Sequence, residues 1–432
     1  MTRILSTTRV KRETCPSVVA RVREKALAPP EVEESVREIV RRVRSDGDKA
    51  LAKYSRSLDG ANLGVGEFRV SPRTIEAASR KQPKQLIRAM RDSLARIVRV
   101  QGNLLKRSTT SVNSRGFKVS VRARPLPSVG CYVPGGRASY ASTVLMTAGV
   151  AKLAGVERVV LCTPAGKDGK VSPAILAAAW IAGVDELYGI GGAHAISAMA
   201  YGTESVARVE KIVGPGGRYV SAAKRLVSSD VFTDFYAGPT ELVVYADESC
   251  EPEVAAWELI GQAEHGEDTL CGLVTCSEMY ASKVRARAKK ILRSVDRRDY
   301  VEASLKNGFA AICSDEKTAI DFINGLAPEH LSIMTRDPLV TGSRIRGAGL
   351  KLLGKYSPCA ASDYMVGTDH VIPTAGLALA RGPLSVLDFV KLDWTVVGSP
   401  SGLRSLMPDL KTLAYAEGLP NHYLSARARF ED

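Results

Sequence analysis

The chain of 432 residues is long enough for two or three domains. Hydrophobic residues make up 45% and charged residues 25% of the chain, which is typical of a globular protein. We find no apolar run near the roughly 20 residues of a membrane helix, and no signal peptide. The sequence therefore predicts a cytoplasmic protein without a membrane partner. The net charge of +14 suggests a nucleic-acid partner, but the Lys and Arg residues are dispersed without interleaved aromatic residues, so we expect no such partner and interpret the charge as a solvated basic surface or an attraction for an anionic cofactor.

The N-terminal quarter is predicted to be mainly helical. Pro29-Pro30 separates a basic arm, residues 1–28, from the body of the chain. Apolar residues at helical spacing predict amphipathic helices at 31–43 and 86–105. Alternating apolar and polar residues then predict a half-buried strand at 117–124.

From about Tyr132 the pattern changes to alternating helices and strands. Helices are predicted at 143–154, 173–182, 195–201 and 219–227, and strands at 158–162, 186–190, 209–213 and 241–245. This alternation predicts a parallel sheet covered on both faces. Strands at 270–275, 310–314 and 331–334 predict a second α/β unit, and Gly382-Pro383 indicates a hinge before a short, mostly helical C-terminal piece.

The eight cysteines are spread singly along the chain, and none forms a C-x-x-C pair. Several stand in apolar runs, such as Cys162 and Cys313. We therefore expect buried, reduced thiols rather than disulfides or a cysteine-bound metal.

Only five histidines occur, and two of them stand in motifs typical of a reactive site. Gln262 and His265 are three residues apart, so on a helix they share one face and can hold a metal or a ligand together. The alternative is a helix C-terminus with His in the last turn and Gly after it. Glu329-His330 begins an apolar strand, where an imidazole with a reference pKa of about 6.5 suits a general base, although a polar turn would look the same.

Two further histidines lie at breaks in the chain. Asp363 and His370 flank a loop containing glycine, which can bend both side chains toward one point, or can be an ordinary polar loop. His422 follows Glu417 near the C-terminus and is expected to be exposed unless it has a function. Two His, one Asp and one Gln are a possible mixed nitrogen and oxygen set for zinc, in which Gln is the unusual ligand. The residues by themselves do not show which of them are partners.

Several separate motifs occur in an order and spacing similar to those of the histidinol dehydrogenase family. They span residues 132–422 and comprise YVPGG at 132–136, GPG at 214–216, AGPTE at 237–241, QAEHG at 262–266, PEH at 328–330, SDYMVGTDHVIPT at 362–374 and EGLPNH at 417–422. Such an ordered series is far more specific than any one of its motifs. The chain therefore resembles this family over nearly its whole length.

The resemblance implies oxidation of L-histidinol to L-histidine through L-histidinal, in two hydride transfers that use two NAD. It implies one zinc ion per subunit, at positions that match Gln262, His265, Asp363 and His422. It also implies that His330 is the general base and that Glu329 activates the water that attacks the aldehyde. The positions implied to contact substrate are Thr240, Gln262, His265, His330, Asp363, His370, Glu417 and His422.

The implied cofactor contacts show the main departures from the family. They match Tyr132, His194 and Gly217, but many members have Gln and Asn where this chain has His194 and Gly217. Gly217 has no side-chain donor, although Arg218 beside it can reach a phosphate. His194 fits a polar residue at a helix N-terminus equally well.

The fold implied by the resemblance is α/β: two incomplete Rossmann-like parallel-sheet domains with small helical terminal segments, in a domain-swapped homodimer. We expect an N-terminal arm or helix at 1–28. A first domain at 29–131 plus 241–382 is expected to carry most zinc and catalytic residues, and a second at 132–240 to form the cofactor side. Residues 383–432 are expected to cross to the other subunit, which would bring Glu417 and His422 into its site.

Three other functions compete with this interpretation. The first is a related zinc and NAD dehydrogenase that oxidises another small alcohol, such as a sulfonated diol. The second is a zinc hydrolase, which would need an open coordination position and no NAD. The third is an inactive, basic nucleic-acid-binding protein, which the intact Glu329, His330 and presumed ligands argue against.

Overall fold

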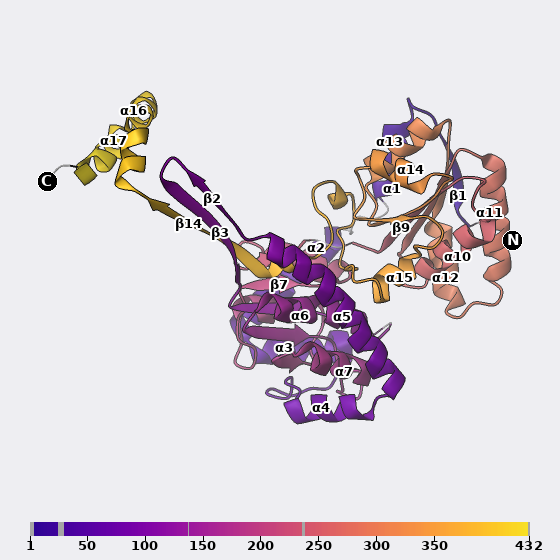
Figure 1. Cartoon of the computed structure of the whole chain (residues 1–432). Coiled ribbons are helices and arrows are strands. Elements are labelled where there is room, and N and C mark those ends of the chain that lie inside the picture. Colours follow the sequence, from indigo (N-terminus) through magenta and orange to yellow (C-terminus); the bar gives the residue numbers. More distant parts are fainter. Residues whose placement is uncertain (1–3, 25–29, 137, 236–237, 431–432) are drawn as a thin grey trace.

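The computed structural model describes residues 4–24, 30–136, 138–235 and 238–430, so the junction between the expected N-terminal arm and the body lies largely outside the described residues. Within these ranges the chain forms two parallel sheets and one antiparallel three-stranded ribbon (Figure 1). A search of the described helices finds none with the length and apolarity of a membrane span. The predicted alternation of helices and strands is present in both parallel sheets.

The five-stranded sheet has the order β6-β5-β4-β7-β8, and every neighbouring pair is parallel. Its strands are β4 (Ser128–Tyr132), β5 (Arg158–Cys162), β6 (Glu186–Tyr188), β7 (Lys211–Val213) and β8 (Phe232–Thr233). The connecting helices are α6 (Ala141–Ala154), α7 (Pro173–Ala182), α8 (Gly192–Tyr201) and α9 (Arg218–Val227). Strand β4 is buried at every position, as expected for a sheet covered on both faces.

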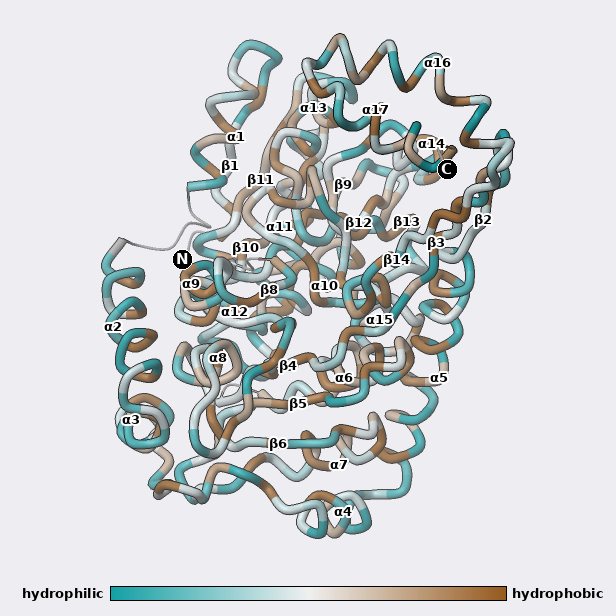
Figure 2. Tube along the Cα trace, turned by 90° about the vertical axis from the view of Figure 1, so that its left-hand side faces the viewer, coloured by the Kyte–Doolittle hydropathy of each residue, from teal (hydrophilic) through white to brown (hydrophobic). Residues whose placement is uncertain are grey.

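Four N-terminal helices cover this same sheet. They are α2 (Pro30–Asp46), α3 (Asp48–Tyr54), α4 (Pro72–Lys81) and α5 (Lys84–Arg107), with a π-helical turn, η1 (Ser55–Asp59), after α3. Val36 and Leu51 pack in one apolar cluster with α8 and α9, and Met90 and Ile97 pack in another with α6 and α7. Figure 2 shows hydrophobic and hydrophilic residues alternating along α2, as expected for a helix with one buried face.

This packing corrects the expected grouping of residues 29–131 with 241–382. The described part of that segment covers the sheet formed within 128–233 instead. Periodicity identifies the apolar face of a helix, but it does not identify the sheet on which that face lies.

The six-stranded sheet has the order β1-β11-β10-β9-β12-β13 and is also parallel throughout. Its strands are β1 (Ser6–Val10), β9 (Glu241–Ala246), β10 (Leu270–Thr275), β11 (Phe309–Cys313), β12 (His330–Met334) and β13 (Leu350–Leu353). The accompanying helices are α1 (Cys15–Glu24), α10 (Pro252–Ala263), α11 (Glu278–Ile291), α12 (Arg298–Asn307), α13 (Glu316–Leu326), α14 (Pro338–Arg344) and α15 (Cys359–Tyr364).

Strand β1 is a second correction, because the N-terminal arm was expected to be separate from the sheets. Its residues pair in parallel with β11, with Ser6 opposite Phe309 and Val10 opposite Cys313. The sequence STTRV is too polar to be predicted as a buried strand, and only an edge position accommodates it.

The antiparallel ribbon has the order β14-β3-β2 and consists of β2 (Thr110–Ser114), β3 (Phe117–Pro125) and β14 (Val390–Gly398). It projects from the body and carries α16 (Pro400–Ala416) and α17 (Pro420–Arg427) at its outer end (Figure 1). The C-terminal piece is mostly helical, as predicted, but strand β14 within it was not predicted. Its consecutive Trp394-Thr395 and Val396-Val397 are all exposed, so the alternation that predicts a half-buried strand is missing.

Candidate functional site

A cavity of about 490 Å³ is lined by residues from both parallel sheets. The five-stranded sheet contributes segments that follow the carboxyl ends of β4 and β7, including Tyr132 and 215–219. The six-stranded sheet contributes segments that precede β9, β10 and β12, including Thr240 and Thr269. The cavity therefore lies at the carboxyl edge of one sheet and at the amino edge of the other.

The carboxyl edge has the topology of a ligand site in open α/β sheets. After β4 the chain passes to β5 and β6 on one side and then returns to β7 on the other, so a switch point lies between β4 and β7. Helices α6 and α9 begin at this edge, and Gly217 is the N-cap residue of α9. Helix N-termini present free N–H groups to anions, so this wall suits a phosphate-bearing ligand.

A buried ion pair fixes the turn before α9. Lys224 and Asp234 form a salt bridge with side chains that are 1% and 0% exposed. Lys224 Nζ donates to the carbonyl oxygen of Gly214 at 3.0 Å, and the Gly214 amide donates to Asp234 Oδ2 at 2.8 Å. Gly214 has a φ of 118°, and a Cβ there would collide with the Tyr132 carbonyl oxygen, so this position requires glycine. Burial lowers the pKa of Lys224 while Asp234 opposes the shift.

At the amino edge, Glu329 and His330 lie where α13 turns into β12. Ala327 closes α13 in the left-handed conformation with a φ of 49°, an uncommon state for a residue with a Cβ. Glu329 is 6% exposed, and its Oε2 accepts a hydrogen bond of 2.7 Å from the Glu241 amide. Glu241 Oε2 accepts from the Glu329 amide at 3.3 Å in return, so two carboxylates lock β9 and β12 together. Burial raises the pKa of Glu241 to about 7.

His330 is 2% exposed and points between two carboxylates. Its Nδ1 lies 3.3 Å from the Glu241 carbonyl oxygen and 3.6 Å from Glu329 Oε2, while its Nε2 lies 3.6 Å from Asp363 Oδ1. Burial works against a charged imidazole, but Glu329, with further contributions from Cys359 and Asp363, outweighs it and raises the pKa of His330. The ring can therefore hold and release a proton at the cavity wall.

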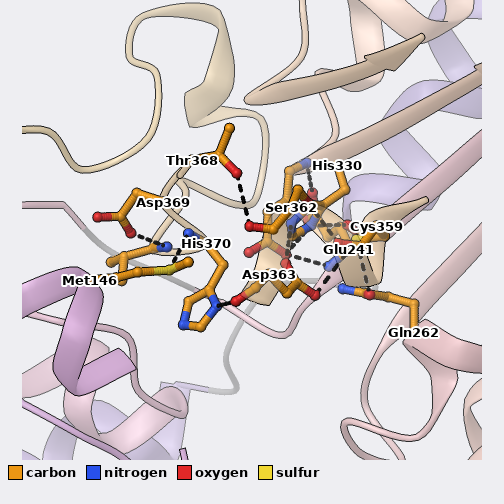
Figure 3. Close-up of polar contacts among 12 residues, drawn as sticks. Met146, Glu241, Gln262, His330, Cys359, Ser362, Asp363, Thr368, Asp369 and His370 are labelled. Carbon is orange, nitrogen blue, oxygen red and sulfur yellow. Dashed lines mark hydrogen bonds and ion pairs between the residues drawn. The ribbon is translucent and has the colours of Figure 1, made fainter. Parts of the chain in front are cut away.

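A cluster of donor atoms surrounds His330 (Figure 3). Cys359 and Asp363 are four residues apart on α15 and share a face. Cys359 Sγ lies 3.3 Å from Gln262 Oε1 and 3.8 Å from Asp363 Oδ2. The ligating atoms of His330, Cys359 and Asp363 all lie within 4.8 Å of one another. A metal ion fits this donor set, because His330 Nε2 and Asp363 Oδ1 are buried without a hydrogen-bond partner in the described structure.

The remaining predicted residues of this wall also face the cavity. Gln262 lies in the last turn of α10, which ends at Ala263, so His265 follows the helix rather than continuing it. The ring of His265 stacks on Tyr140 with a centroid distance of 6.5 Å. His370 is fixed by its Nε2 at 2.9 Å from Thr143 Oγ1 and its Nδ1 at 3.2 Å from the Asp363 carbonyl oxygen. Within one chain the cavity thus brings together all but two of the predicted metal and substrate residues, and Thr240, Gln262, His265, Glu329, His330, Asp363 and His370 line it.

The structure does not bring Glu417 and His422 to this cavity. Both are exposed on the projecting piece formed by α16 and α17 and lie outside the cavity lining. His194 differs from expectation as well: its side chain is 0% exposed, with Nε2 3.1 Å from Asp59 Oδ2. It lies outside the lining, whereas Tyr132 and Gly217 line it, so the structure favours the structural interpretation of His194.

Sequence reasoning missed Cys359, Glu241 and the Lys224–Asp234 pair. The spacing of Cys359 and Asp363 was a usable signal, but all eight cysteines had been interpreted together as buried reduced thiols. Cys359 is indeed buried and free, and Cys276 is the exposed exception to that expectation. Glu241 begins an apolar strand, and Lys224 stands beside Arg225 near the end of an amphipathic helix, so neither pattern indicates a buried partner.

Comparison with known proteins identifies close relatives. The family model described as histidinol dehydrogenase matches residues 22–430. Histidinol dehydrogenase of Methanothermobacter thermautotrophicus is 42% identical over 92% of this chain and 93% of its own, and that of Methanosarcina mazei is 41% identical over 93% and 92%. The crystal structure of histidinol dehydrogenase from Elizabethkingia anophelis superposes with a TM-score of 0.93 at 30% identity, covering 100% of this chain and 99% of that one.

Proposed function

The chain belongs to the histidinol dehydrogenase family, and we propose on this basis that it oxidises L-histidinol to L-histidine through L-histidinal, with two NAD as hydride acceptors. It is thus an oxidoreductase of histidine biosynthesis. The observation that carries the chemistry is the buried Glu329–His330 pair at the amino edge of the six-stranded sheet, beside Asp363 and Gln262. The opposite wall of the same cavity presents helix N-termini suited to the phosphates of a dinucleotide.

We infer separate roles for the two catalytic residues from their positions. His330 accepts the hydroxyl proton as hydride leaves the carbinol carbon, and Glu241 and Glu329 hold the ring in place through Nδ1. Glu329 takes a proton from the water that attacks the aldehyde carbon, while the Glu241 amide holds the carboxylate still. The hydrate then loses its second hydride, again with His330 as the base. A single cavity that serves both oxidations keeps the reactive aldehyde bound between them.

Zinc fits the donor atoms at this wall, and we propose Gln262, His265 and Asp363 as its ligands from this chain, with His422 supplied by a second copy. When bound, zinc supplies a Lewis acid that fixes the orientation of the substrate. The buried, unpartnered Asp363 Oδ1 supports this assignment. Tyr132, Gly217 and the adjacent Arg218 line the wall where we place NAD.

Formation of NADH from L-histidinol tests the proposed reaction. We expect two NADH per histidinol, loss of turnover when a chelator removes the metal, and recovery when zinc is restored. A protein that binds zinc but forms no NADH would contradict the proposal. In that case other small alcohols, including sulfonated diols, become the substrates to assay.

We also propose that the chain works as a homodimer with shared sites. The ribbon and α16–α17 project from the body and expose large apolar side chains, among them Trp394, Val397 and Leu413. Such a surface on an extended arm is typical of a protein–protein contact. An arm seated on a second copy can bring Glu417 and His422 to that copy's cavity, which supports the crossing predicted from the sequence.

Complementation between two inactive variants tests this sharing. His330→Gln disables the body of one copy, and His422→Ala disables the arm of the other. In a 1:1 mixture that exchanges subunits at random, half of the dimers have one intact site, so we expect about a quarter of the wild-type activity. Mixed dimers that form but stay inactive would show that the arm does not complete its partner's site.

A further inference from the structure

The donor cluster around His330 contains a ligand that the family-derived zinc set does not use, namely the thiol of Cys359. Its side chain is buried, with Sγ facing Gln262 and Asp363. Its amide donates to Glu258 Oε1 at 2.8 Å, which fixes the start of α15 against α10. The thiol is therefore held in place beside the catalytic base.

Three separations among these atoms are close to those between neighbouring ligands of a tetrahedral metal ion. With bonds of about 2.0–2.2 Å to nitrogen and oxygen and about 2.3 Å to sulfur, neighbouring ligand atoms around zinc lie about 3.3–3.7 Å apart. The observed separations are 3.6 Å from His330 Nε2 to Asp363 Oδ1, 3.8 Å from Cys359 Sγ to Asp363 Oδ2 and 3.3 Å from Cys359 Sγ to Gln262 Oε1. Small side-chain rotations are enough to direct all four groups at one ion.

Two of these side chains each have one buried atom without a hydrogen-bond partner, and these two atoms face each other at 3.6 Å. His330 is 2% exposed and Asp363 is 7% exposed, and their Nε2 and Oδ1 atoms make no hydrogen bond within the described structure. Buried polar atoms are nearly always satisfied, so their convergence beside a thiol indicates a bound cation.

We propose that His330, Cys359 and Asp363, with Gln262 Oε1 as a fourth donor, form an alternative metal position that selects a thiophilic divalent cation and withholds His330 from catalysis. The thiol loses its proton to solvent when the ion binds, and the imidazole binds as the neutral base. A sulfur ligand favours ions such as Cd²⁺ over hard ions such as Mg²⁺ or Mn²⁺. The inhibitory part of the proposal rests on the proposed function, because it takes His330 as the base.

The alternative position competes with the productive one, because Gln262 and Asp363 belong to both. It needs no residue from the exposed arm, so one body can form it before a second copy supplies His422. Excess thiophilic metal is therefore expected to inhibit the enzyme, because it coordinates the imidazole of His330 and does not displace NAD.

Spectroscopy of the metal-free, full-length protein tests the ligand set directly. Titration with Co²⁺ under anaerobic conditions is expected to produce a thiolate-to-cobalt charge-transfer band in the wild type. Cys359→Ser is expected to lose this band, while Cys276→Ser, which alters an exposed cysteine, is expected to keep it. The ¹¹³Cd chemical shift of the wild type, which needs no variant, is expected to report one sulfur ligand. A wild type without the band, or a band that survives in Cys359→Ser, would overturn the proposal.

Inhibition by Cd²⁺ tests the functional consequence. Each protein is loaded with one equivalent of zinc, and the rate of NADH formation is normalised to its own uninhibited rate. We expect Cys359→Ser to require at least about tenfold more Cd²⁺ than Cys276→Ser for half inhibition, since one soft ligand is lost. Equal sensitivity would overturn the inhibitory role. A charge-transfer band without NADH formation in any sample would instead contradict the proposed function and leave the metal position standing.

Discussion

The two walls of the cavity belong to opposite edges of similar parallel sheets. At the carboxyl edge of the five-stranded sheet, helices α6 and α9 begin, and the lining is rich in glycine and backbone groups. At the amino edge of the six-stranded sheet, helices α10 and α13 end, and the lining carries carboxylates and imidazoles. Helix N-termini favour anions and helix C-termini favour cations, so one wall suits phosphate and the other suits metal and proton transfer.

This difference explains which substitutions each wall tolerates. Backbone N–H groups remain when a side chain changes, so a residue without a side-chain donor, Gly217, can serve as the N-cap of α9. At the amino edge the reacting atoms are side-chain atoms, and nothing in the backbone replaces them. The comparison predicts severe losses from small changes at one wall and mild losses at the other.

The largest expected effect is at His330. His330→Gln removes the base while keeping a polar side chain, and we expect turnover with L-histidinol to fall by about 10²–10⁴-fold. Tyr132→Phe, on the opposite wall, removes only the hydroxyl that accepts a hydrogen bond from the Gly192 amide. We therefore expect turnover to fall by less than about tenfold. Steady-state NADH formation measures both, with zinc content as the control. Equal losses of turnover in the two variants would contradict the expected difference in tolerance between the two walls.

Lys224→Met tests the support of the phosphate-side wall. It leaves the buried Asp234 carboxylate unpaired, and the expected loss in unfolding free energy is about 3–5 kcal/mol. The carbonyl oxygen of Gly214 loses the hydrogen bond from Lys224, so the turn before α9 is held less firmly. We therefore expect KM for NAD to rise by a larger factor than kcat falls. Denaturant unfolding and NAD-dependent kinetics measure the two effects. Arg41→Ala, at an exposed ion pair with Glu38, is the control and should leave the stability nearly unchanged. An unchanged KM for NAD in a folded Lys224→Met protein would show that the turn at Gly214 does not contribute to the proposed binding of NAD.

Glu329→Gln distinguishes two functions within one wall. The amide oxygen can still accept from the Glu241 amide, so the fold is retained, but the group can no longer take a proton from water. We expect the aldehyde-to-acid half to slow by about 10²-fold, with the first oxidation much less affected. The yield in a timed assay should fall from two NADH per histidinol toward one. A uniform loss in both halves would assign Glu329 to positioning alone.

The smallest expected effect is a pH dependence of stability that originates at Glu241. Its pKa in the folded protein is about 7, above the ordinary value of 4.5, so the protonated form is favoured by folding. The resulting stability is fully present below about pH 4.5 and is lost as the pH rises through about 7. We expect a contribution on the order of 1–3 kcal/mol, measured by denaturant unfolding across this range. The slope should flatten in Glu241→Gln, and an unchanged slope would place its origin elsewhere.

The elements of the two sheets were largely predictable, whereas their spatial relations were not. Helices such as α7 and strands such as β5 and β10 match their predicted bounds, because their apolar runs end at clear turn residues. The exposed β14 and the edge strand β1 have no buried alternation to reveal them. The covering of the 128–233 sheet by α2–α5 depends on tertiary packing that periodicity does not encode.

The candidate site shows the same limit. Glu329, His330 and Asp363 were found through motifs in the sequence, and the cavity brings them together. Cys359 was missed because a buried thiol in a helix looks the same whether or not it faces a metal. His194 was given a cofactor role as one of two options, but its burial against Asp59 gives it a different partner.

The pairing of β1 with β11 has a consequence for the order in which the protein forms during synthesis. The N-terminal strand has no neighbouring strand until residues 309–313 are made, whereas β3 pairs with β2 at once and gains its second neighbour only with residues 390–398. The strands of the five-stranded sheet and the helices α2–α9 lie within residues 30–233, whereas Val371, Val386 and Phe389 join their apolar core from later in the chain. Most of this unit can therefore fold while the ribosome is still translating the rest. The wall that follows β4 and β7 can thus largely form first, and the wall that carries Glu329 and His330 is then added to it.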